Sequence, residues 1–311
     1  MKNIHLYLSV FTFSCFTIIF YGCTKNNEGE PPCADCPINY SIIDFEPAWS
    51  PDGEWIAYYH GDSRPGYNGI YLIRPDGTGN HLWQPRAVET PAWSPDGKWI
   101  AFSYHAHIWK KKFDGDSLTQ LTFQGRNFFP SWSPYDNLIV YVQSVCSHMP
   151  CGLWLLNIEC NIHTSIVLYG MYPDFNPFNK QILFRTKWVE KNGNVLGDSV
   201  FLYDYNSGIK SFLVALINAN WDNSFFKYNN SGTKVLFTSQ PRDGDGLPGL
   251  WIMNDDGSNV KRLTSQAYSA DWSPDGSRIV FTDSRKINGR LWIMDADGNN
   301  KKQLTFEHHF N

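Results

Sequence analysis

The sequence predicts an all-β domain, a six-bladed β-propeller in which each blade contains four strands. A short turn motif led by an aromatic residue occurs six times after residue 40, and similar strand-like segments follow each copy in the same order. The leading aromatic residues lie at positions 49, 93, 132, 175, 228 and 272, so the copies are 39 to 53 residues apart. That spacing is close to the roughly 40 to 50 residues of a propeller blade.

The turn motif is Trp-Ser-Pro-Asp-Gly in three copies, which begin at Trp49, Trp93 and Trp272, and is degenerate in the others. Pro sets φ for the second position of a turn, Asp accepts hydrogen bonds from nearby amides, and Gly tolerates the positive φ that reverses the chain. In two weaker copies we expect Asn137 and Asn179 to replace Gly in the left-handed conformation. We also expect the leading aromatic residue to pack between adjacent blades.

β-branched and aromatic residues follow every turn, which predicts strands. The first set covers 55–58, 99–102, 138–141, 181–184, 234–237 and 278–281, and the second covers 70–72, 108–109, 153–155, 200–202, 250–252 and 291–293. Short outer strands follow at 120–122, 262–264 and 303–305. Four-stranded sheets of this kind stack radially around a channel. Residues 41–45 either join the first and last blades or cap one of them.

The order Trp-Ser-Pro-Asp-Gly, an Ile-Ala-Phe-like strand, Leu-Trp-Ile-Met and Asp-Gly resembles the propeller repeat of the TolB family, over residues 46–306. The resemblance implies the fold but not an activity, because related propellers serve as periplasmic binding scaffolds, peptidase gating domains and sugar-cleaving enzymes. TolB itself has an additional N-terminal α/β domain. Only about 20 residues separate Cys23 from the first blade here, so the resemblance is to the propeller alone.

The N-terminal segment predicts export. Lys2 precedes an apolar run over residues 4–21, and Gly22-Cys23 then resembles a bacterial lipobox. We therefore expect a lipoprotein signal peptide at 1–22, lipidation of Cys23, a tether at 23–40 and the propeller at 41–311. An uncleaved membrane anchor and a soluble secreted form are the alternatives. Each places the propeller in the bacterial cell envelope, facing the periplasm or the cell surface.

Charge and cysteine usage restrict the partners and the cross-links. The net charge of -4 lacks the basic footprint of nucleic-acid binding, so no nucleic-acid partner is expected. Disulfides can form outside the cytoplasm, and we expect Cys146 and Cys151 to close a small loop. Cys33 and Cys36 are spaced for a local disulfide or tether. Cys160 is then the odd thiol.

The sequence bears on two classes of catalytic site. A serine peptidase is not expected, because no Gly-x-Ser-x-Gly motif occurs and no residues remain for a hydrolase domain. A metal-dependent polysaccharide lyase or hydrolase is the alternative function, with His60, His105 and His107 as ligands in loops between the second and third strands of their blades. His148 falls in the equivalent loop of blade three. No other cofactor is expected.

The first hypothesis is a non-enzymatic binding scaffold that recognises an envelope protein, a peptide or a glycan on one face of the ring. Its candidate contacts are aromatic, Arg and polar residues in the connections that enter the inner strands, since such residues commonly anchor interfaces. They are Arg86, Glu89, Arg126, Asn127, Phe128, Phe129, Tyr169, Tyr172, Asn220, Trp221, Asp222 and Tyr268. A sensor subunit acting through an envelope partner is a further alternative.

Overall fold

The computed structural model describes residues 42–64, 66–86, 90–144, 151–189, 195–217, 225–239, 249–283 and 288–306, with the backbone alone at 187–189, 195–198 and 216–217. Contacts divide the chain into two units, 1–39 and 40–311, and the described residues all belong to the second. No helix in this described part is long and apolar enough to cross a bilayer.

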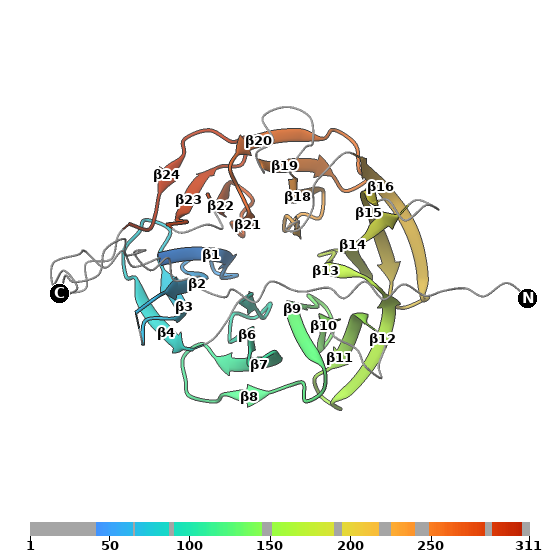
Figure 1. Ribbon diagram of the computed structural model, residues 1–311, viewed down its shortest axis with the longest axis horizontal. Coiled ribbons are helices and arrows are strands. Elements are labelled where there is room, and N and C mark those ends of the chain that lie inside the picture. The colour runs from blue at the N-terminus through green and yellow to red at the C-terminus, as the bar shows by residue number, and fades with distance from the viewer. Residues whose placement is uncertain are drawn as a thin grey trace, which may run out of the picture. The chain divides into compact units, whose positions relative to one another are not determined.

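The second unit is a six-bladed β-propeller, as predicted (Figure 1). Blades one to three contain β1 (Ile42–Trp49), β2 (Ile56–Asp62), β3 (Gly69–Ile73), β4 (His81–Pro85); β5 (Ala92–Trp93), β6 (Trp99–Tyr104), β7 (His107–Lys112), β8 (Thr119–Gln120); and β9 (Arg126–Trp132), β10 (Leu138–Ser144), β11 (Gly152–Asn157), β12 (Ile162–Leu168). Blades four to six contain β13 (Met171–Phe175), β14 (Gln181–Val189), β15 (Val195–Asp204), β16 (Ile209–Ile217); β17 (Phe226–Tyr228), β18 (Lys234–Ser239), β19 (Gly249–Asn254), β20 (Lys261–Ser265); and β21 (Ser269–Trp272), β22 (Arg278–Thr282), β23 (Leu291–Asp295), β24 (Lys302–Gln303).

Each sheet is antiparallel and keeps the chain order of its strands, from the inner to the outer strand. This order puts the turn between the first and second strands, and the turn between the third and fourth, on one side of the ring, which we call the turn face. The connections between second and third strands, and from each outer strand to the next inner strand, lie on the opposite side. We call that side the connection face.

The apolar core lies between the blades. It consists of six clusters, and each combines buried side chains from two neighbouring blades. The leading residues Trp93, Trp132 and Trp272 also link blades through their indole N–H groups, whereas the indole of Trp49 donates to Gly53 in its own blade. Trp93 Nε1 donates to the Ala48 carbonyl oxygen at 3.1 Å, and Trp132 Nε1 donates to the Ala92 oxygen at 3.0 Å. The prediction that these residues pack between blades is confirmed.

The ring closes between blade one and blade six without any exchange of strands among the described residues. β1 belongs to the sheet of blade one and its backbone contacts blade six. The Asp44 N–H donates to the Gly289 oxygen at 2.9 Å, and the Asn288 N–H donates to the Ile42 oxygen at 2.7 Å. The first strand therefore joins the two ends of the ring, one of the two roles left open for residues 41–45.

The repeated turn depends on Ser as well as on Asp. In the second copy, Ser94 Oγ donates to Asp96 Oδ1 at 2.6 Å and accepts the Trp99 N–H at 2.9 Å, while Asp96 accepts the Lys98 N–H at 3.1 Å. Gly97 takes a φ of 68°, which only Gly adopts without strain.

The prediction for the two Asn-containing copies is wrong, because neither Asn137 nor Asn179 has a positive φ. In these copies the chain reverses through a bend, without the backbone hydrogen bond that the Gly97 N–H donates to the Ser94 oxygen in the second copy. In blade three, Ser133 Oγ accepts the N–H groups of Tyr135 and Asp136. No left-handed residue is required there, so the loss of Gly is tolerated for a different reason from the one expected.

Candidate functional site

The connection face holds the described ligand-binding candidates. Arg126, Asn127 and Phe128 begin β9, Tyr172 lies in β13, Tyr268 directly precedes β21, and Arg86 follows β4. These candidates share the connection face because each lies at, or next to, the strand end that this topology places on that side of the ring. Three other candidates, Glu89, Trp221 and Asp222, lie outside the described residues, as does Asn220.

Five side chains of blades three and four form a continuous group, which we call the aromatic–arginine cluster. Arg126 Cζ lies 5.7 Å from the ring centre of Phe128, which is 6.4 Å from that of Phe129. The ring centre of Phe129 lies 4.4 Å from that of Tyr172, and Arg185 Cζ lies 4.8 Å from the same Tyr172 ring centre. Cation–π and tilted aromatic contacts of this kind fix the orientation of the rings.

The cluster has a buried side and an accessible side. Tyr172 and Arg185 are 8% and 5% exposed, whereas Phe128 and Phe129 are partly exposed and Arg126 is exposed. The predicted contact residue Tyr172 therefore supports the exposed rings and is not itself an accessible surface. Arg126 and the two Phe rings form the part that a ligand could touch.

Asn127, predicted as a contact residue, is not accessible at the surface. The side chain is fully buried, and its Nδ2 donates to Gln124 O at 2.8 Å and to Thr122 Oγ1 at 3.1 Å. These bonds hold the connection into blade three against the outer strand of blade two. Asn127 therefore positions its neighbours Arg126 and Phe128.

A left-handed bulge recurs at the inner strands. The residue three positions before the leading aromatic residue has a positive φ in four blades. The φ is 56° at Phe129, 52° at Tyr172, and 55° at both Glu46 and Thr90. Such a conformation costs a residue other than Gly about 1–2 kcal/mol. In blade three an extra residue lies between the pairs Val140–Ser131 and Val142–Phe128. Bulges re-aim side chains next to functional sites, and this one orients the rings of the cluster.

A second polar group lies on the inner strands of blades four, five and six. Lys227 Nζ is 3.2 Å from Asp174 Oδ1, and Asp174 Oδ2 accepts the Tyr228 N–H at 2.9 Å. Burial lowers the pKa of Lys227, but Asp174 and Asp271 outweigh that effect and raise it overall. Desolvation raises the pKa of Asp271 to about 6, although Lys227 opposes the rise. Lys227 remains 32% exposed, so this group is open to solvent.

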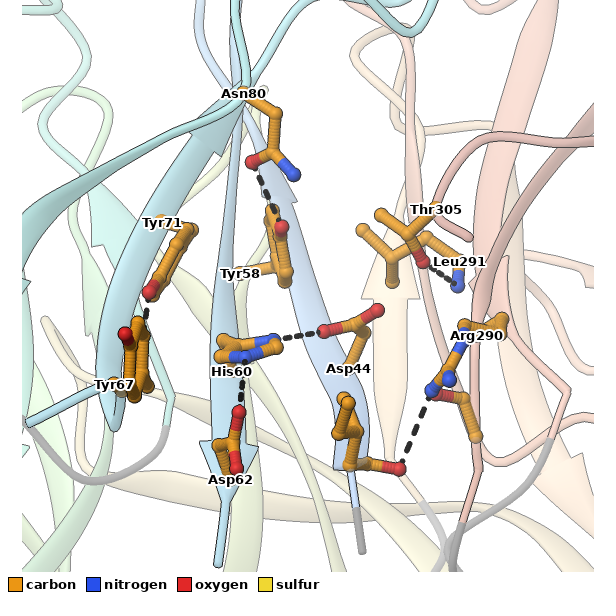
Figure 2. A network of polar contacts seen from close by, with 12 residues as sticks. Asp44, Tyr58, His60, Asp62, Tyr67, Tyr71, Asn80, Arg290, Leu291 and Thr305 are labelled. Atoms are coloured by element: carbon orange, nitrogen blue, oxygen red, sulfur yellow. Dashed lines mark hydrogen bonds and ion pairs between the residues drawn. The ribbon is translucent and has the colours of Figure 1, made fainter. Parts of the chain in front are cut away.

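His60 occupies a buried polar network rather than the loop that was predicted (Figure 2). It lies inside β2, and His60 and Asp44 are both fully buried. His60 Nδ1 is 2.6 Å from Asp44 Oδ1, and Nε2 is 3.8 Å from Asp62 Oδ2, which is ion-paired with Arg64. β2 extends to Asp62, four residues beyond the predicted strand end, and this extension carries His60 into the sheet.

Tyrosines and Arg290 complete the surroundings of this network. Tyr58 Oη donates to Asn80 Oδ1 at 2.8 Å, and Tyr71 Oη donates to the Tyr67 oxygen at 3.1 Å. From blade six, Arg290 Nη1 donates to the Ile42 oxygen at 3.3 Å. The network lies where the ring closes, so it stabilises the junction between blades one and six.

The other two predicted metal ligands lie at the connection face. His105 and Ala106 form the two-residue turn between β6 and β7, with φ values of 49° and 60°, and His107 is the first residue of β7. Burial, and to a lesser extent His105, lower the pKa of His107. Among the described residues no group of three or more His, Cys, Asp or Glu side chains could hold a metal ion. His148 lies outside them.

The described cysteines are Cys151, which is disulfide-bonded, and Cys160, which is free and exposed. Cys146, the predicted partner of Cys151, and Cys23, the predicted lipidation site, lie outside the described residues. The pairing of Cys146 with Cys151 therefore stays a prediction.

Comparisons with known proteins agree on the fold. Residues 64–133 match the model of the dipeptidyl peptidase IV N-terminal region. No curated protein matches the chain. TolB from Acinetobacter baumannii is similar in structure, with a TM-score of 0.64 and 19% identity over 86% of this chain and 64% of that one.

Two further structures extend this picture. A TolB from Agrobacterium tumefaciens has a TM-score of 0.60 and 17% identity, over 82% of this chain and 90% of that one. Oligogalacturonate lyase from Vibrio parahaemolyticus has a TM-score of 0.56 and 10% identity, over 82% of this chain and 78% of that one. Because all three sequence identities are low, these similarities are evidence for the fold alone.

Proposed function

We propose that this chain, a TolB-like six-bladed β-propeller, is a binding scaffold of the bacterial cell envelope that recognises a protein, a peptide or a glycan on its connection face. The aromatic–arginine cluster carries the proposal. The exposed guanidinium of Arg126 and the partly exposed rings of Phe128 and Phe129 lie on a buried base of Tyr172 and Arg185. Aromatic residues and Arg supply most of the binding energy in many interfaces.

Preorganisation of the cluster supports the same reading. The strained φ values of Phe129 and Tyr172 persist because the inner strands are held on both sides by neighbouring blades. Rings that are already fixed lose little conformational entropy when a partner binds. The cluster is thus suited to contact a preformed surface.

The proposed location rests on the N-terminal sequence. An export signal at 1–22 and lipidation at Cys23 would attach the propeller to a membrane through the tether at 23–40. Attachment confines the scaffold to the envelope and raises its effective concentration toward partners there. Metabolic labelling with a palmitate analogue tests the anchor, since Cys23→Ser should abolish incorporation of the label.

The experiment for the function places a photo-crosslinking amino acid at Phe128 in the full-length chain, expressed in the producing bacterium. A partner identified by mass spectrometry is purified, and its affinity is then measured directly. We expect Arg126→Ala and Phe128→Ala each to weaken the complex by about tenfold or more.

Matched controls come from the rest of the ring. Arg74 lies between β3 and β4 on the turn face, and Phe212 lies on the outer strand β16 with 60% exposure. Arg74→Ala and Phe212→Ala should bind as the wild type does. Equal affinity of the Arg126 and Phe128 variants, with folding retained, would reject the connection face as the binding site.

A further inference from the structure

A polar cleft opens between blades three and four on the turn face, away from the aromatic–arginine cluster. Its volume is about 450 Å³, within the roughly 300 to 1,000 Å³ of small-molecule sites. The inner wall is formed by Tyr135, Asp136 and Asn137 from the degenerate turn of blade three, and Lys180 and Tyr205 from blade four. This cleft is independent of the proposed function.

The side chains around the cleft are smaller than those at the equivalent positions between blades one and two. Between blades one and two the same space is filled by Trp55, Trp83, Trp93 and Phe113. There the ring centres of Trp93 and Phe113 are 5.0 Å apart, and Trp83 Nε1 donates to the Phe113 oxygen at 3.0 Å. The strand registers place Leu138, Ile166, Phe175 and Tyr205 at the equivalent positions between blades three and four. Every Trp is replaced by a smaller side chain, so space remains.

The residues that depart from the repeat also furnish the polar wall. Tyr135 and Asp136 stand where the three Trp-Ser-Pro-Asp-Gly copies have Asp and Gly. Asp136 Oδ2 accepts hydrogen bonds from Lys180 Nζ at 2.9 Å and from Tyr205 Oη at 2.8 Å. The bond from Lys180 lowers the pKa of Asp136, and burial is the main cause that raises the pKa of Tyr205 to about 12. At neutral pH the wall therefore presents an ionised acceptor and a protonated phenol.

The chemistry of the lining excludes several classes of ligand. Leu138 is the one aliphatic residue among those that line the cleft, so an apolar ligand has little to contact. The lining carries two carboxylates, Asp136 and Glu159, but only one ammonium group, that of Lys180. Because Lys180 is already paired with Asp136, the binding of an anion is disfavoured. No metal-binding group occurs among the described residues.

The remaining chemistry fits a polyhydroxylated ligand. Asn137 and Asn206 each bring an amide donor and an amide acceptor to the cleft, which is the pairing that sugar hydroxyls require, although one hydrogen of Asn137 Nδ2 is donated to Glu159. Asn157 Oδ1 accepts the N–H groups of Glu159 and Cys160, so Asn157 contributes its Nδ2 donors. The Tyr135 ring is 50% exposed and presents an apolar face against which the C–H groups of a pyranose can pack. We propose that this cleft binds a neutral oligosaccharide.

The test measures binding of four neutral tetrasaccharides, cellotetraose, maltotetraose, laminaritetraose and chitotetraose, to the full-length chain by saturation-transfer NMR and calorimetry. Leu138→Trp restores the Trp that blade one has at this position and should fill the cleft. We expect at least one sugar to bind, and this variant to weaken its affinity by at least tenfold. Leu82→Trp adds the same ring on β4, outside the cleft, and should bind normally.

A second variant keeps the test decisive if Leu138→Trp does not fold. Tyr135→Asp restores the repeat consensus, removes the exposed ring and should also weaken binding at least tenfold. Failure of all four sugars to bind the wild type, or unchanged affinity in a folded cleft variant, would overturn the proposal. Arg126→Ala, on the opposite face, should leave sugar binding unchanged, which separates this site from the proposed function.

Discussion

Asp271 in the last blade accepts a hydrogen bond from the backbone N–H of Trp49 in the first blade, at 2.7 Å and across 222 residues of sequence. Asp174 makes the same contact with the Tyr228 N–H between blades four and five, at 2.9 Å. In both cases the carboxylate directly precedes the leading aromatic residue of its own blade. This contact is one of several that close the ring where no strand is exchanged.

The raised pKa of Asp271 makes a prediction about pH. Burial raises its pKa in the folded state to about 6, above the ordinary value of an Asp in the unfolded chain, so its contribution to stability is present at low pH and is lost as the pH rises through 6. We expect the unfolding free energy of the wild type, relative to Asp271→Asn, to fall by about 1 kcal/mol between pH 5 and 7.5. Denaturant titrations of both proteins at the two pH values measure this difference.

Asp275 provides the control for that experiment. Its hydrogen bond from Ser273 is the first cause that lowers its pKa to about 2, so both its folded and unfolded values lie below the measured range. Asp275→Asn should show no change relative to the wild type between pH 5 and 7.5. A pH-independent difference for Asp271→Asn would show that Asp271 is ionised throughout this range.

The Ser of the repeated turn should contribute measurably to stability. Ser94 is buried and bridges Asp96 and the Trp99 N–H, so Ser94→Ala leaves that amide without its acceptor. We expect a loss of about 1–2 kcal/mol, measured by denaturant unfolding. Ser94→Asn should lose less, because Asn229 fills this role in blade five by accepting the Lys234 N–H at 3.0 Å. Equal losses in the two variants would contradict this assignment.

The cysteines predict a labelling pattern. A maleimide should modify the exposed, free Cys160 in the native protein, and Cys160→Ser should remove that labelled peptide. The disulfide-bonded Cys151 should react only after reduction. Peptide mapping without reductant identifies its partner, which we expect to be Cys146. A Cys151 peptide linked to another cysteine would contradict the predicted loop.

The repeat was predictable from sequence because the same local rule occurs six times. Turn-forming and strand-forming residues, such as those around Trp93, determine the conformation of only a few neighbouring residues. Because the same short pattern is repeated along the chain, it can be recognised in the sequence. The contacts that close the ring were not predictable in this way. Asp44, His60 and Asp271 lie outside the repeated letters, and their partners are set by the register of strands or by blades far apart in sequence.

The candidate site shows the same division. Arg126 and Phe128 could be placed on the connection face because they lie at the start of an inner strand, whose face follows from the strand order. Arg185 was missed because it directly follows the apolar run 181–184 and reads as the end of a strand. The mistake at His60 has the same origin, since sequence alone did not show how far β2 continues beyond Tyr58.

The buried pair of His60 and Asp44 should be costly to break but replaceable as a unit. Blade three has Gln143 and Asn127 paired in the same register as His60 and Asp44 in blade one. His60→Gln alone leaves the buried Asp44 carboxylate without its 2.6 Å contact, and we expect a loss of about 3–5 kcal/mol.

The double variant, His60→Gln with Asp44→Asn, removes both groups and copies the neutral pair of blade three. We expect it to recover at least about half of that loss, because no carboxylate is left uncompensated at position 44. Denaturant unfolding of the wild type, both single variants and the double variant gives the coupling energy. Additive losses would mean that the two side chains stabilise the ring junction independently, and that the network is not a coupled pair.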